Sequence, residues 1–241
     1  MKTNNTIVKK KTSMIESSYH SGWCDFFMKH QKTFETIMTK VEKDGEYYPK
    51  RENVLRSFQT LGPKDIKVVL LGQDPYIGAE EIDGVLEPQA CGLSFGVSRQ
   101  HRIPPSLLNM FKEIQACYPQ SHWPGHGCLE RWAKEENIFL LNASLTVRPH
   151  ESNSHSYLWS HFTDDVIQYI SNVSDGTIFL LMGNFAKSKK QFINTEKHKV
   201  FETVHPSPLS SHKGFFGCRV FYHINEYLKK TGKKEIQWFL K

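Results

Sequence analysis

The sequence lacks a long hydrophobic run, and it lacks the cysteine and histidine spacing of a metal site. No run of about 18 apolar residues occurs, so no membrane-spanning helix is expected. The 5 cysteines are odd in number and form no Cys-x-x-Cys pair, which favours reduced, buried thiols over disulfides or zinc. His122 and His126, near Cys128, also lack the spacing of metal ligands. No metal site is therefore predicted.

The amino terminus lacks the apolar core of a secretory signal. Residues 1–17 are polar and lysine-rich at their start, and we predict a disordered basic tail, with a nuclear-import or nucleic-acid-binding arm as the alternative. Residues 18–241 show no repeat, low-complexity tract or linker and are expected to form a single domain. The formal net charge is +6. These features predict an intracellular protein of the nucleus or cytoplasm that is not secreted.

Apolar patterns predict strands that alternate with helices along the chain. Strands are expected at residues 66–71, 138–141, 177–182 and 200–204. Helices are expected at 18–41, 53–58, 107–114 (with Ser106 as its N-cap), 161–170 and 221–228. Residues 77–96 are predicted to be a long loop. The sequence therefore predicts an α/β fold whose central four-stranded parallel sheet is flanked by helices.

Polar side chains follow each predicted strand directly or within three residues. They are Asp74, Asn142, Asn184 and His205. Because the carboxyl ends of parallel strands meet at one edge, we expect these side chains to converge there. Each residue alone is ordinary turn chemistry. A phosphoesterase or a nucleotide-binding site could show the same four residues, although the carboxylate clusters of a metal-dependent phosphoesterase are absent from the sequence.

Several motifs narrow these possibilities. The segments Gly72–Tyr76, Leu140–Arg148 and His205–Ser210 strongly resemble those of family 1 uracil-DNA glycosylases. Residues 92–95, 104–107 and 214–218 look like the same family and occur in the same order. The resemblance runs from about Phe58 to the carboxyl terminus. It implies an enzyme that flips uracil out of DNA and hydrolyses the N-glycosidic bond in base excision repair, without a metal or cofactor.

The resemblance also implies roles for individual residues. The catalytic residues would be Asp74 and His205, and the uracil-binding residues would be Gln73, Tyr76, Phe95 and Asn142. The DNA-binding residues would be Ser106, Gly183, Asn184, Ser207, Leu209, His212 and Lys213. The implied partners are single- and double-stranded DNA that contains uracil, and possible further partners are replication proteins or a DNA-mimic inhibitor protein. A monomer is expected.

The sequence departs from the family pattern near the first motif. Ile77 stands where the family usually has a histidine that is associated with phosphate contact and water organisation, and Asn184 stands where a serine is common. The loop from residue 77 to residue 95 is longer than usual and acidic. We expect it to be a solvated loop tip, with regulation or partner binding as the alternative. The loss of the histidine keeps an alternative open, in which a glycosylase fold tethers DNA or serves a replication factor with weak or secondary catalysis.

Overall fold

The computed structural model describes residues 18–122 and 125–239. The basic tail predicted for residues 1–17 lies outside the described residues. The helices are α1 (Cys24–Asp44), α2 (Ser57–Thr60), α3 (Pro105–Cys117), α4 (Glu130–Lys134), α5 (Ser156–Val173), α6 (Gly183–Ser188) and α7 (Val220–Lys230). The strands are β1 (Val68–Gly72), β2 (Ala79–Ile82), β3 (Val85–Pro88), β4 (Ile138–Asn142), β5 (Ile178–Met182) and β6 (Lys199–Thr203).

Four of these strands form the predicted parallel sheet, in the order β4-β1-β5-β6. Every neighbouring pair in this sheet is parallel. The register places Gly72, at the end of β1, beside Asn142, at the end of β4. The predicted fold class is therefore confirmed, and the carboxyl ends of all four strands lie at one edge.

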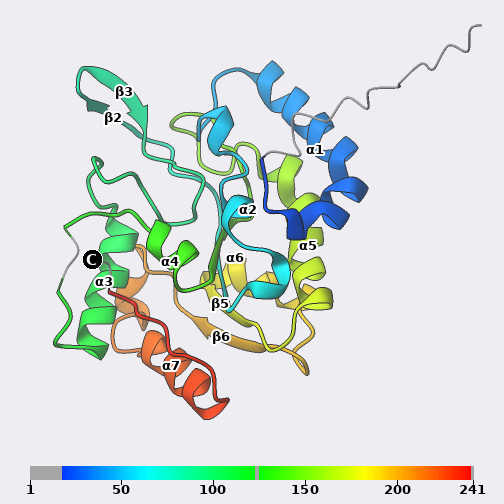
Figure 1. The fold of residues 1–241 in the computed structure, drawn as a ribbon. Helices are drawn as coiled ribbons and strands as arrows, with labels where there is room; N and C mark the ends of the chain where they lie inside the picture. Colours follow the sequence, from blue (N-terminus) through cyan, green and yellow to red (C-terminus); the bar gives the residue numbers. More distant parts are fainter. Residues whose placement is uncertain (1–17, 123–124, 240–241) are drawn as a thin grey trace, which may run out of the picture.

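The central strands are buried on both faces, which explains their continuous apolar sequences. Along β1, Val69 and Leu71 pack into the apolar cluster that includes residues of α1 and α5. Val68 and Leu70 pack into a second cluster, which includes residues of α3 and α7. Figure 1 shows these helix pairs on opposite sides of the sheet. Alternate side chains of one strand thus pack against two helical layers. The burial of each of these side chains contributes roughly 1.5–3 kcal/mol to the stability of the fold.

The prediction of one long loop over residues 77–96 was wrong, because this segment contains an antiparallel hairpin. Strands β2 and β3 pair from Ala79 opposite Pro88 to Ile82 opposite Val85. The turn between them is Asp83-Gly84, and both residues have positive φ angles, 51° and 80°. Asp-Gly is a favoured pair for such tight hairpin turns. The hairpin extends from the body of the molecule (Figure 1).

Some helix boundaries also differ from the predictions. Ser106 is not an N-cap: Pro104 occupies that position, and the pyrrolidine ring of Pro105 begins α3. Gly183 and Asn184 begin the short helix α6, for which no helix was predicted. The helix predicted over residues 53–58 is divided into a 3-10 turn (Arg51–Asn53) and α2. The short helix α4 was not predicted.

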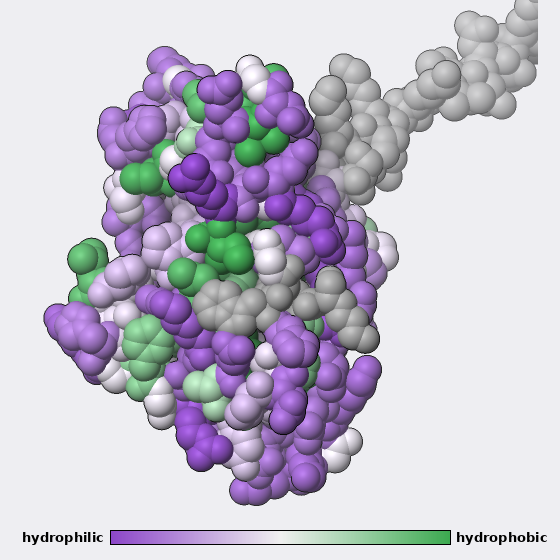
Figure 2. Space-filling view, turned by 90° about the vertical axis from the view of Figure 1, so that its left-hand side faces the viewer, coloured by the Kyte–Doolittle hydropathy of each residue, from purple (hydrophilic) through white to green (hydrophobic). Residues whose placement is uncertain are grey.

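The surface on the side of α3 and the hairpin is mostly hydrophilic, with apolar side chains in small, separate patches (Figure 2). In the part of the chain that the structure describes, no helix is long and apolar enough to cross a membrane.

Candidate active site

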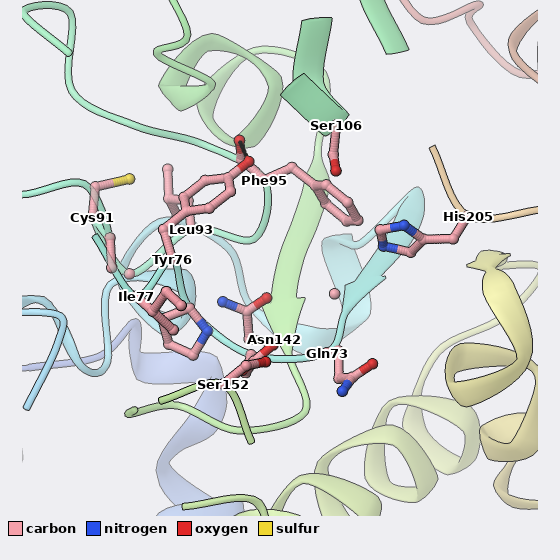
Figure 3. Close-up of a pocket in the computed structure, with 15 residues that line it drawn as sticks. Gln73, Tyr76, Ile77, Cys91, Leu93, Phe95, Ser106, Asn142, Ser152 and His205 are labelled. Carbon is pink, nitrogen blue, oxygen red and sulfur yellow. Dashed lines mark hydrogen bonds between the residues drawn. The ribbon is translucent and has the colours of Figure 1, made fainter. Parts of the chain in front are cut away.

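A pocket of about 270 Å³ lies at the carboxyl edge of the sheet. The structure brings together in its wall seven of the predicted catalytic, uracil-binding and DNA-binding residues: Gln73, Asp74, Tyr76, Phe95, Ser106, Asn142 and His205 (Figure 3). The wall also includes Ile77, Ala90, Cys91, Leu93 and Ser152. Gly183 and Asn184 line a smaller adjoining cavity, which Gln73 and His205 share. The strand ends therefore meet as the parallel topology requires.

The side chain of Asn142 occupies space that only a glycine at position 72 leaves open. A Cβ atom on Gly72 would lie 2.2 Å from Oδ1 of Asn142 and 3.0 Å from Cβ of Ser94. Asn142 is only 7% exposed, yet its side-chain amide forms no hydrogen bond with any described residue. Since an amide offers both a donor and an acceptor, Asn142 presents an unused pair of hydrogen-bonding groups at the pocket.

Asp74 follows β1, and its carboxylate is held by the segment between β4 and α5. One of its oxygens, Oδ2, accepts hydrogen bonds from the Ser152 hydroxyl at 2.8 Å and from the backbone N–H of Asn153 at 2.7 Å. The next residue is Pro75, which restricts the backbone of Asp74. Sequence reasoning missed Ser152 and Asn153. The signal available was the run of short polar residues between β4 and α5.

The ring of His205 is held in one neutral form by its own loop. Its Nδ1 atom accepts a hydrogen bond from the backbone N–H of Ser207 at 3.0 Å, so the proton of the neutral ring resides on Nε2. Burial lowers the pKa of His205 below the ordinary value of 6.5. Gly183 allows this approach, because a Cβ atom there would lie 2.9 Å from Cβ of His205. At neutral pH the site therefore contains an uncharged N–H donor.

Two aromatic rings form apolar walls of the pocket. The hydroxyl of Tyr76 donates a hydrogen bond to the backbone carbonyl of Phe95 at 3.0 Å, and burial raises the pKa of this phenol. Phe95 has a φ angle of 60°, which is uncommon for a residue with a side chain. Its ring centroid lies 6.0 Å from that of His205. The side chain of Gln73 instead donates to Oδ1 of Asn153 and points away from Phe95 (Figure 3).

The loop after β6 exposes an apolar side chain to solvent, and hydrogen bonds fix the backbone of this loop. Leu209 is 85% exposed. Its N–H donates to the Ser207 hydroxyl at 3.3 Å, and the buried Asn109 of α3 donates to the carbonyl of Pro206 at 2.8 Å. His212 and Lys213 are exposed in the 3-10 turn that follows. A single exposed leucine is ordinary on a protein surface, so Leu209 is a candidate contact residue only because the same loop carries His205 and Ser207.

Ile77 packs against an apolar cluster that includes Tyr48, Ala90 and Val147. It also lines the pocket, where it offers no polar group beside Asp74.

The acidic hairpin is attached to the body by two of its four carboxylates. Glu80 accepts hydrogen bonds from the Arg102 N–H at 3.1 Å and from the Gln89 amide at 2.8 Å, and Glu87 pairs with Lys50 at 2.5 Å. The other two, Glu81 and Asp83, are exposed.

Within residues 18–122 and 125–239, no three His, Cys, Asp or Glu side chains are grouped so that they could hold a metal ion. A polar pocket at the carboxyl edge of a parallel sheet, with helices on both faces, is the arrangement of the α/β enzymes. A sequence model of the Uracil DNA glycosylase superfamily matches residues 59–229, and the chain belongs to this superfamily.

Individual relatives agree with this assignment. The chain is 44% identical to the uracil-DNA glycosylase of Fusobacterium nucleatum over 215 residues, which cover 89% of each protein. The crystal structure of mimivirus uracil-DNA glycosylase is similar with a TM-score of 0.86 and 31% identity, over 94% of this chain and 89% of the other. A variant of mimivirus UNG in complex with UGI matches with a TM-score of 0.85 and 32% identity, over 92% of this chain and 89% of the other.

Proposed function

We propose that this protein is a uracil-DNA glycosylase, which hydrolyses the N-glycosidic bond of deoxyuridine in DNA and leaves an abasic site. The observation that carries the proposal is the free side-chain amide of Asn142, which faces a pocket that also holds Asp74 and the neutral ring of His205. This hydrolysis requires three groups: an amide that recognises the base, a carboxylate that stabilises the cationic sugar, and a neutral hydrogen-bond donor to the departing base.

The proposed chemistry follows from the charges that develop during bond cleavage. Positive charge grows on the sugar and negative charge grows on the uracil ring. The carboxylate of Asp74 would stabilise the cationic sugar and orient the attacking water, as carboxylates do in glycoside hydrolysis. The Nε2–H group of His205 would donate to uracil O2 as it becomes negative, and a preorganised donor of this kind contributes about 3–4 kcal/mol. Because the ring is already neutral, it need not lose a proton first.

Base recognition would be divided between Asn142 and Tyr76. The Asn142 amide would pair with O4 and N3–H of uracil. Cytosine presents the opposite donor and acceptor pattern at these atoms and would leave buried polar groups unpaired. Thymine differs from uracil only by its 5-methyl group, which the ring of Tyr76 would exclude. Phe95 would stack on the base, and the contribution of Gln73 would come from its backbone, since its side chain is bonded to Asn153.

The uracil must leave the duplex to reach this pocket, which costs a few kcal/mol. We propose that Leu209 fills the vacated base stack, as apolar wedges do in other distorted duplexes. Hydroxyl groups, backbone N–H groups and positive charge suit contacts with phosphates. The residues proposed for these contacts are Ser106, Gly183, Asn184, Ser207, His212 and Lys213.

Uracil release in the presence of EDTA tests the proposal. The protein should convert uracil-containing oligonucleotides to abasic sites and free uracil. The alternative, a glycosylase fold that tethers DNA or serves a replication factor with weak or secondary catalysis, predicts binding of the same oligonucleotides with few or no abasic sites. That outcome would overturn the proposed function.

Tyr76→Ala is expected to begin releasing thymine from DNA while it still releases uracil. The reason is steric, because the substitution removes the ring that would meet the 5-methyl group and also the hydrogen bond to Phe95. Excision should be measured on matched oligonucleotides that contain a single U·A or T·A pair. A variant that still cleaves uracil but releases no thymine would show that another residue excludes the methyl group.

Ile77→His is expected to strengthen DNA binding below about pH 6.5, where an unperturbed histidine becomes charged. A new cationic phosphate contact should steepen the dependence of log affinity on log salt concentration by roughly 0.9 on duplex DNA. The preference for uracil should not change. Binding should be titrated at several salt concentrations at pH 6 and pH 8. If affinity and salt dependence match the wild type at both pH values, position 77 does not face phosphate.

We propose that the protein acts as a monomer inside the cell, in the nucleus or cytoplasm, with replication proteins as further partners. A variant of mimivirus UNG forms a complex with UGI. For this chain we propose that an inhibitor protein that mimics DNA would cover the face around Leu209 and the pocket.

A further inference from the structure

We propose that Ser152 is a positioning residue for the hydrolytic step. Its hydroxyl holds one oxygen of Asp74, so that the other oxygen is directed at the attacking water. The inference rests on the proposed function and adds to it a residue that no motif of the sequence indicated.

The contacts of Asp74 are one-sided. The Ser152 hydroxyl and the Asn153 N–H both donate to Oδ2, at 2.8 and 2.7 Å, whereas no described residue donates to Oδ1. The terminal torsion of an aspartate has broad energy minima, so this torsion alone does not determine which oxygen faces a substrate. Two donors on a single oxygen fix the orientation of the carboxylate. Ser152 also lines the pocket itself.

The segment that carries Ser152 is itself anchored. The backbone N–H of His150 donates to the carbonyl of Ile77 at 2.9 Å, and the N–H of Arg148 donates to the Ser154 hydroxyl at 2.7 Å. Arg148 also pairs with Asp44 of α1 at 2.7 Å, and the fully buried His155 contacts the same carboxylate at 3.0 Å. The hydroxyl of Ser152 is therefore presented to Asp74 by a segment that is tied to two other parts of the fold.

The hydroxyl is the side-chain donor on which this orientation depends. Pro75 has no N–H, and the side chain of Ile77, which also lines the pocket, is apolar. After donating to Asp74, the Ser152 oxygen retains lone pairs that could accept a hydrogen bond from the attacking water. The second donor, the N–H of Asn153, cannot be removed by changing a side chain, so Ser152 is the position at which the arrangement can be tested.

Three variants test the role of this hydroxyl. Ser152→Ala removes it, and Ser152→Thr retains it, with the added methyl group at an exposed position. Ser156→Ala is the matched control, because that hydroxyl lies nearby and bonds to the Asn153 carbonyl without touching Asp74. Each should be assayed for single-turnover uracil excision and for the Kd of an uncleavable oligonucleotide.

We expect Ser152→Ala to lower the single-turnover rate by roughly 10-fold or more, the size of a lost hydrogen bond to a charged group, and to leave the Kd within about 2-fold (under 0.5 kcal/mol). Ser152→Thr should recover most of the rate, and Ser156→Ala should match the wild type. A wild-type rate for Ser152→Ala would overturn the inference, as would an equal loss in Ser156→Ala, which would indicate a loosened segment. An inactive wild-type protein would overturn the proposed function and this inference together.

Discussion

Asp74→Asn is expected to lower the rate of uracil excision by roughly 100-fold or more, while DNA binding survives. Asparagine has nearly the same shape, and its oxygen still accepts the hydrogen bonds of Ser152 and Asn153. The negative charge is lost, and electrostatic stabilisation of a charged transition state is commonly worth two to three orders of magnitude (about 10²–10³). Single-turnover kinetics would measure the rate, and fluorescence anisotropy would measure the binding.

Asp83→Asn is the matched control for this change. It removes the same charge at the exposed tip of the hairpin, so its rate should equal that of the wild type. Near-normal turnover by Asp74→Asn would remove Asp74 from the mechanism. Loss of DNA binding along with the rate would mean that the substitution disturbs the whole face.

His205→Ala is the second substitution with a large expected effect, a loss of roughly 100- to 1,000-fold in the single-turnover rate. The Nε2–H donor would be removed from the position where negative charge develops on uracil. His223→Ala, an exposed histidine of α7, is the control and should leave the rate unchanged. A loss of less than about 10-fold in His205→Ala would show that another group stabilises the departing base.

The pH dependence of the wild-type protein provides an independent test of the His205 assignment. Burial lowers the pKa of His205, so protonation of the ring requires a pH below the ordinary value of 6.5. Because the proposed active form is neutral, the contribution of His205 should be complete above pH 6.5 and should fall only as the pH drops through the lowered pKa. A rate that already falls as the pH is lowered from 8 to 6.5 would contradict a lowered pKa for His205 or require a different titrating group, and a rate that rises over this range would require a charged imidazole.

The sheet and the convergence of polar residues could be predicted because both depend on short, local patterns. Continuous apolar runs such as Val68–Leu71 predict strands that are buried on both faces, and parallel strands bring the residues that follow them to one edge. The predictions of Asp74, Asn142 and His205 as neighbours required no knowledge of side-chain geometry.

The hairpin was missed for a physical reason. Its residues Glu80–Glu87 are mostly acidic or exposed, so the segment has little apolar periodicity, although Asp83-Gly84 is a hairpin signal on its own. Similarly, nothing in the sequence shows that Ser152 would meet Asp74, because the two residues lie on segments joined only by the fold. The close approach of the Asn142 side chain to Gly72 follows from the strand register that pairs these two residues, and the sequence does not show that register.

Base selectivity depends on two side chains, because the free amide of Asn142 would pair with uracil and the ring of Tyr76 would exclude thymine from the pocket. The decisive measurement is the single-turnover release of free base, identified by mass, from three otherwise identical single-stranded oligonucleotides that carry one uracil, cytosine or thymine. We predict release of uracil alone, in EDTA and at pH 7. Release of cytosine or thymine at a comparable rate, or of no base at all, would contradict this prediction.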